Sequence, residues 1–341
     1  MIPQGAAWQH LRQLALTIVP DGTHIPSGQP PTLSVWLSEG AFTVAATSGQ
    51  SFDLTAAQVE IASALFTEAA YHLDHAAEHS VTVRNQLAAD RWFSAAWLCV
   101  TFYYWAFFAA LSLTRLIGKT SLFLSRSTVT NLHILSNSAS RSLGQGPFLL
   151  ECSPALTVSY LNVSVRKSGR SRVHDLIWRL VFETVAGLAS IAKAGAGSLE
   201  DRLYAALDRS AQLLGPAWPS DLRNLINYSP GKGYTNVRRS PGINAFGVIQ
   251  AKQSPTFADA LNRLEDNLAR LPMRATVLDN PTIATAILVD LTFALDAIAT
   301  DLHQEVVDRR HLDRRWNNSR NDFIRRQFSL FEARSWPYAE A

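Results

Sequence analysis

The sequence has little cysteine, little charge and no internal repeat. Its 341 residues include two cysteines, 17% charged residues and 47% apolar residues. Cys99 and Cys152 cannot form the disulfide framework of a small secreted domain, and we expect them to be reduced and buried. The high apolar fraction excludes a disordered chain, and the missing repeat excludes a fibrous one. We therefore expect a globular protein of one large domain or two smaller ones.

No basic segment followed by an apolar stretch marks a secretory signal at the N-terminus, so we expect a cytoplasmic protein. The segment 92–114 is nevertheless long enough to span a membrane, because its 23 residues carry no charge between Arg91 and Arg115. Its aromatic residues crowd the middle rather than the ends, and basic residues on both sides give no orientation. No second segment is expected to be comparable. We therefore favour a buried core helix over a membrane-linked protein.

The charges are unevenly distributed along a chain whose formal net charge is only +3. Residues 1–90 contain eight acidic and two basic residues, whereas residues 91–174 contain nine basic residues and one acid, Glu151. Most basic residues are arginines, which suit bidentate contact with phosphate or carboxylate groups. The asymmetry indicates either a phosphate-facing surface or two parts of the chain that attract each other.

The spacing of apolar residues predicts a mainly α fold with a few short strands. Helices are expected at about 55–79, 86–117, 172–193, 198–214, 219–230, 255–270, 281–308 and 311–331. Short strands are expected at 33–37, 41–45, 148–150 and 156–161. Thr55 and Ser198 are expected to be helix N-caps, because their hydroxyls can accept a hydrogen bond from the first helical turn.

Composition divides the chain into three sections. Residues 1–54, which are punctuated by glycine and proline, predict an irregular or strand-bearing N-terminal extension. Residues 55–240 are expected to form a helical core, in which the polar stretch 121–146 is flexible. Residues 241–341 are expected to form a C-terminal helical section that can close the same bundle.

The amino-acid pattern of the segment 103–118 resembles that of a known family of helical domains. It begins with Tyr103 and Tyr104, continues through aromatic and small residues, and ends with Leu-x-Gly. This pattern resembles the central helix of the HEPN superfamily of small helical domains, and also the YaaC-like proteins, which carry a similar Tyr-Tyr helix. The resemblance implies a HEPN-like helical bundle that dimerises, associates with nucleotides or RNA, and works in antiviral or toxin–antitoxin systems. Buried tyrosine hydroxyls in such a helix need polar partners.

A second resemblance lies in the segment 221–228. HEPN ribonucleases carry an arginine, then a polar residue, and a histidine four to six residues after the arginine. Arg223 and Asn224 match the first two positions, whereas Tyr228 stands where the family has histidine. The resemblance implies that Arg223 and Asn224 contact a phosphate near the tyrosine helix. A phenol with a pKa near 10 is a poor base at neutral pH, so cleavage of RNA by Tyr228 is not expected.

Two clusters of basic residues are further candidates for nucleotide or RNA binding. Both combine cations with backbone N–H groups of a glycine turn or of a helix N-terminus, although solvated surface turns remain the alternative. Their residues are Lys232, Arg238 and Arg239 in one cluster, and Arg166, Lys167, Arg170 and Arg172 in the other. The arginine-rich segment 309–326 is a third candidate nucleic-acid surface, or else a docking helix.

One pattern suggests a metal. His75, Glu78 and His79 match the His-x-x-Glu-His pattern of some zinc peptidases. Helical spacing places all three on a polar helix face, which favours solvated side chains, so we expect no metal and no cofactor.

Together these features predict a noncatalytic, HEPN-like subunit that binds a nucleotide or RNA. By the resemblance, it belongs to a defence or toxin module and regulates a catalytic partner, such as a sirtuin-type NAD-consuming effector, as a homodimer or hetero-oligomer. The alternatives are a metal-independent endoribonuclease that uses Arg223 and Asn224 with a borrowed base, and a membrane-linked protein.

Overall fold

The computed structural model describes residues 5–25, 32–48, 50–88, 94–136, 143–169, 172–193, 197–229 and 257–312, with residues 316, 318, 320 and 322. The helices are α1 (Ala6–Ile18), α2 (Leu33–Glu39), α3 (Gln58–Ala88), α4 (Ala95–Leu116), α5 (Arg126–Leu135), α6 (Val173–Ala192), α7 (Leu199–Leu214), α8 (Trp218–Tyr228), α11 (Phe257–Ala269) and α12 (Pro281–Arg309). The strands are β1 (Phe42–Thr47), β2 (Ser51–Ala57), β3 (Lys119–Leu124), β4 (Gly146–Pro154) and β5 (Tyr160–Lys167). The prediction of a mainly α fold with a few strands is confirmed.

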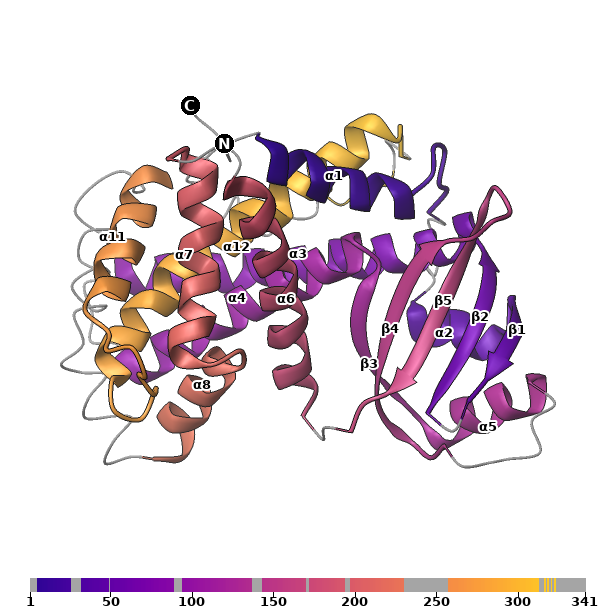
Figure 1. Ribbon diagram of the computed structural model, residues 1–341, viewed down its shortest axis with the longest axis horizontal. Coiled ribbons are helices and arrows are strands. Elements are labelled where there is room, and N and C mark those ends of the chain that lie inside the picture. The colour runs from indigo at the N-terminus through magenta and orange to yellow at the C-terminus, as the bar shows by residue number, and fades with distance from the viewer. Residues whose placement is uncertain are drawn as a thin grey trace.

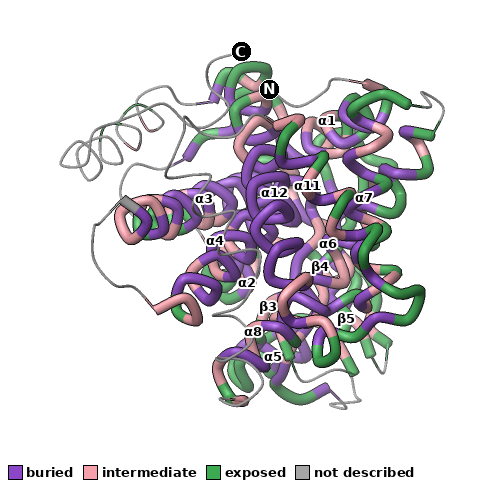
Figure 2. Tube along the Cα trace, turned by 90° about the vertical axis from the view of Figure 1, so that its left-hand side faces the viewer, coloured by how far each residue is buried: buried purple, intermediate pink, exposed green. Residues whose placement is uncertain are grey.

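Helix α4 is the centre of the helical part. It packs mainly against α3 and α12, while α6 and α8 contact it from other sides. Figure 1 shows this helical part on one side and the sheet on the other, with α6 between them. Figure 2 shows that α4 and α12 are buried over most of their length. The C-terminal helices α11 and α12 thus complete the bundle begun by α3 and α4.

Two helices, α4 and α12, are long and apolar enough to cross a membrane. The expectation that no second segment is comparable is wrong, because the most apolar stretch of α12 is at least as hydrophobic as that of α4, although it includes Asp290 and Asp296. In the most apolar 18-residue stretch of each helix, 78% of the residues are buried in α4 and 89% in α12. Both helices therefore bury their apolar surface inside the protein, as core helices of soluble proteins do. Cys99 and Cys152 are buried and form no disulfide, as expected.

The five strands form one antiparallel sheet in the order β1-β2-β5-β4-β3. Residues alternate between its two faces, and those on the inner face are buried, as for Leu150 and Val165. On the outer face, Leu149 pairs with Arg166, and Glu151 pairs with both Ser164 and Lys119 across the adjacent strands. The outer face of β3, β4 and β5 therefore carries a charged and partly apolar surface beside α6 (Figure 1).

The N-terminal section is more helical than its sequence predicts. Helix α1 lies within the section expected to be irregular, and α2 replaces the strand expected at 33–37. Alternating apolar residues suggest a strand there, but the capping residues decide the structure. The Thr32 hydroxyl accepts a hydrogen bond from the backbone N–H of Val35, and Gly40 ends the helix with a φ of 73°.

Four further expectations concern individual helices, strands and their caps. Ser198 caps α7, and its hydroxyl accepts a hydrogen bond from Asp201, which confirms that prediction. Thr55 is not a cap, because it lies inside β2, and α3 begins only at Gln58. The polar stretch expected to be flexible contains β3 and α5. Most of the helix expected at 311–331 lies outside the described residues.

Candidate functional site

The two tyrosines of α4 face different surroundings. Tyr103 is fully buried, and Tyr104 is half-buried at the edge of the helical part. The indole Nε1 of Trp178, on α6, donates to the Tyr103 hydroxyl oxygen at 3.3 Å. The same hydroxyl lies 2.7 Å from Nδ1 of His174, also on α6. Tyr103 therefore links α4 to α6 and has the polar partners that a buried tyrosine needs.

Helix α8 places Arg223 against Tyr104. Its residues Leu222 and Ile226 are buried, so Arg223 and Asn224 face away from that apolar contact. The Arg223 Nη2 group donates to the Tyr104 hydroxyl at 2.8 Å, and Nη1 donates to Asn224 Oδ1 at 3.0 Å. The expectation that the Arg-Asn turn lies near the tyrosine helix is confirmed.

The guanidinium of Arg223 lies beside two aromatic rings and has no carboxylate partner within the described residues. Its central carbon lies 5.7 Å from the centre of the Tyr104 ring and 6.0 Å from that of Tyr228, which is 72% exposed. The Arg223 Nε is buried and makes no hydrogen bond among these residues. The positive charge is thus held in place without being neutralised, as required for binding an anion.

His174 completes this cluster, although no sequence pattern points to it. Its ring stacks on Phe107 with a centroid distance of 4.2 Å. Burial, and then the charge of Arg223, lower the pKa of His174, so the imidazole is neutral at pH 7. The Tyr103 hydroxyl oxygen accepts from Trp178, and its second hydrogen bond, to Nδ1 of His174, runs in the direction that the histidine tautomer sets. We name Tyr103, Tyr104, His174 and Arg223 the Arg223 cluster.

The histidines of α3 pack against aromatic rings. His75 and His79 both stack on Phe108 of α4, with centroid distances of 5.0 and 5.5 Å. His79 also stacks on Tyr104, which extends the aromatic surface beside the Arg223 cluster. His75 Nδ1 lies 3.3 Å from Glu78 Oε2. No group of three metal-ligating side chains occurs among the described residues.

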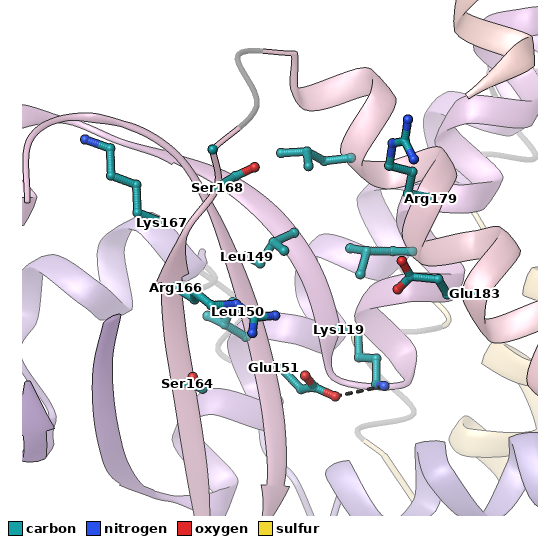
Figure 3. A pocket seen from close by; sticks show the side chains of 13 residues that line it. Lys119, Leu149, Leu150, Glu151, Ser164, Arg166, Lys167, Ser168, Arg179 and Glu183 are labelled. Atoms are coloured by element: carbon teal, nitrogen blue, oxygen red, sulfur yellow. Dashed lines mark ion pairs between the residues drawn. The ribbon is translucent and has the colours of Figure 1, made fainter. Parts of the chain in front are cut away.

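The predicted basic clusters are only partly within the described residues. Lys232, Arg238, Arg239 and Arg170 lie outside them. Arg172 is exposed at the N-cap of α6. Arg166 and Lys167, at the end of β5, line a cavity of about 740 Å³ between the sheet and α6 (Figure 3). The lining of this cavity includes no residue of the tyrosine and Arg223 site described above.

Described arginines of the segment 309–326 form ion pairs within the protein. Arg310 pairs with Asp21 at 3.0 Å, and Arg320 pairs with Asp74 at 2.6 Å. These charges are already neutralised, which weakens the interpretation of the segment as a nucleic-acid surface.

Neither a family model, a curated protein nor a solved structure matches this chain.

Proposed function

We propose that the protein is a cytoplasmic, HEPN-like, noncatalytic subunit that binds RNA or a nucleotide at the Arg223 cluster. In this proposal it belongs to a defence or toxin module, as a homodimer or in a complex whose catalytic partner it regulates, such as a sirtuin-type NAD-consuming effector. The observation that carries the binding proposal is the guanidinium of Arg223, which lies beside the rings of Tyr104 and Tyr228 and has no carboxylate partner among the described residues.

The geometry of Arg223 suits a phosphate on a single strand. A guanidinium binds phosphate through charge-assisted hydrogen bonds, and exposed aromatic rings stack on the bases of a single strand without requiring a particular sequence. Tyr228 offers an exposed ring beside the guanidinium, and Asn224 offers a neighbouring amide. The same residues would contact one phosphate and an adjacent base.

The hydrogen bonds of the Arg223 cluster favour binding over cleavage. The base that a HEPN ribonuclease needs is missing at Tyr228, since a phenol holds its proton at neutral pH. Nδ1 of His174 is already hydrogen-bonded to the Tyr103 hydroxyl. This nitrogen is therefore not free to accept a proton from a ribose hydroxyl.

Fluorescence anisotropy with a labelled single-stranded RNA of mixed sequence tests this proposal. We expect Arg223→Ala to weaken binding at least tenfold, because the phosphate loses its guanidinium. Arg209→Ala is the matched control, since Arg209 is an exposed arginine on α7, and its affinity should equal that of the wild type. Equal RNA affinity of Arg223→Ala and Arg209→Ala, or no binding of RNA by the wild type, contradicts the proposal.

One alternative function is a metal-independent endoribonuclease, because the neutral His174 lies near Arg223. If the Tyr103 hydroxyl turns away, His174 can accept a proton near a phosphate held by Arg223. Incubation of RNA with the protein in EDTA distinguishes the two functions. Cleavage that is lost in both Arg223→Ala and His174→Ala supports the ribonuclease, whereas intact RNA supports the noncatalytic subunit.

A further inference from the structure

The cavity beside α6 is lined by the β-sheet on one side and by helix α6 on the other. Its floor is the outer face of the sheet, where Leu149, Glu151 and Arg166 stand on adjacent strands. Its opposite wall is α6, and the segment 167–169 closes one end. Figure 3 shows these side chains from the sheet and the helix on two sides of one space. At about 740 Å³, the cavity has the size of sites that hold small organic ligands.

Helix α6 presents a mixed face to this cavity. The four lining residues of α6 recur at helical spacing and are Leu176, Arg179, Leu180 and Glu183. The opposite face of α6 carries Trp178 and Phe182 into the protein core. The wall of the cavity therefore offers apolar surface, a guanidinium and a carboxylate on one rigid element, whose other face is fixed by packing.

The cations of the cavity differ in whether they already have partners. Lys119 forms an ion pair with Glu151 at 2.8 Å, and the Lys167 Nζ donates to the carbonyl oxygen of Gly144 at 3.1 Å. Within the described part of the chain, neither Arg166 nor Arg179 has an ion pair or a side-chain hydrogen bond, although the charge of Arg179 partly offsets the rise that burial causes in the pKa of Asp221 on α8. The Nε of Arg179 is moreover buried without a partner. The two arginines thus leave donor groups for an anion that the protein itself does not supply.

We propose that this cavity binds a nucleoside phosphate. The phosphate lies with Arg166, because a guanidinium binds phosphate oxygens in a bidentate manner. Arg179, on the opposite wall, adds a second positive charge to the lining. The base lies between Leu149 of the sheet and the leucines of α6. Ser164 and Glu183 accept hydrogen bonds from ribose hydroxyls or from base amino groups.

Other small ligands fit this lining less well. A phosphate ion leaves most of the volume and the leucine walls unused, and a metal cation is repelled by the arginines. A fatty acid uses the leucines and a cation but buries Glu183 without a partner.

This inference goes beyond the proposed function, because it adds a small-molecule site that is separate from the Arg223 cluster. One helix joins the two places, since α6 carries His174 of the cluster in its first turn and the cavity wall further along. The two proposals can nevertheless fail independently. RNA binding is measured at Arg223, and nucleotide binding is measured at residues that do not contact Arg223.

Isothermal titration calorimetry of the full chain with the four ribonucleoside monophosphates and triphosphates tests the inference. We expect at least one of these nucleotides to bind with a micromolar Kd, and inorganic phosphate and the matching nucleoside to bind at least tenfold more weakly. Arg166→Ala should weaken nucleotide binding at least tenfold, because Arg166 is exposed and has no other role in the described contacts. Ser164→Trp should abolish binding by filling the floor of the cavity.

Arg126→Ala is the matched control, since Arg126 is an exposed arginine on α5 that does not line the cavity. Its nucleotide affinity should equal that of the wild type, and thermal unfolding should show that all three variants fold. The inference is overturned if none of the nucleotides binds, or if inorganic phosphate binds as tightly as the nucleotide. It is also overturned if Arg166→Ala and Ser164→Trp, once shown to be folded, bind like the wild type.

Discussion

Two arginines contact the central helix α4 in different ways. Arg115, in the last turn of α4, is almost fully buried, and its Nε lies 2.6 Å from Glu68 Oε2 on α3. Arg223, on α8, contacts Tyr104 and Asn224, and no carboxylate pairs with it in the described part of the chain. The first charge is neutralised inside the protein, whereas the second is oriented by neutral groups.

This difference indicates which arginine serves the fold and which is available to a ligand. A buried cation without a counter-charge is costly, so Arg115 and Glu68 must be kept together. The other carboxylate oxygen of Glu68 also accepts a hydrogen bond from the backbone N–H of Leu33, at the start of α2. Arg223 is half-buried and reaches solvent, so its charge can remain without a partner until an anion binds.

The largest expected effect is the loss of stability when the buried ion pair between Arg115 and Glu68 is broken. Glu68→Ala should lower the free energy of unfolding by about 3–5 kcal/mol, because Arg115 stays buried without its carboxylate. Urea unfolding measures this change. Glu78→Ala, an exposed glutamate on the same helix, should change it by less than about 0.5 kcal/mol. If Glu68→Ala costs no more than Glu78→Ala, Arg115 does not depend on its partner, and the comparison fails.

The next effect concerns the hydroxyl of Tyr103. Tyr103→Phe leaves the Trp178 indole N–H and His174 Nδ1 without their buried partner, so the free energy of unfolding should fall by about 1–3 kcal/mol. Tyr104→Phe is the control. Its hydroxyl is half-buried, and Arg223 can bond to water instead, so a loss of less than about 1 kcal/mol is expected. The reverse order of the two losses would show that Tyr104, and not Tyr103, holds the helices together.

A smaller effect, on the salt dependence of RNA binding, distinguishes the contribution of the positive charge of Arg223 from that of the shape of its side chain. Arg223→Gln should weaken RNA binding and reduce the slope of log affinity against log salt concentration by about 0.7, the value for one phosphate contact on a single strand. Arg223→Lys keeps the charge and should keep the slope. Anisotropy titrations at several salt concentrations measure both. An unchanged slope in Arg223→Gln would mean that Arg223 does not contact a phosphate.

The position of Arg223 could be predicted from sequence, whereas its neighbour His174 could not. The long uncharged aromatic segment predicts a buried helix, and the resemblance of residues 221–228 to the HEPN ribonuclease pattern singles out the Arg-Asn turn as its neighbour. His174 is far from Arg223 in the chain, and it joins Arg223 only because α6 and α8 both pack on α4. A search limited to local motif spacing cannot detect such a contact.

The cavity and α2 show two other limits of the sequence. Arg166 and Lys167 are visible as a basic patch, but the wall that makes the patch a cavity comes from the packing of α6 against the sheet. Residues 33–37 have the apolar alternation of a strand, yet Thr32 and Gly40 cap them as a helix. Capping residues and tertiary packing outweigh local propensity in both places.

The smallest expected effect reports directly on the electrostatics of the Arg223 cluster. The pKa of His174 is lowered first by burial and then by the positive charge of Arg223, which disfavours the imidazolium. Arg223→Ala removes the second cause, so the pKa of His174 should rise toward its ordinary value. A pH titration of the His174 ring resonances by NMR measures this rise, with Arg209→Ala as the control. A pKa that is unchanged or lower in Arg223→Ala would show that the charge of Arg223 is neutralised near His174, and the distinction between Arg223 and Arg115 would then disappear.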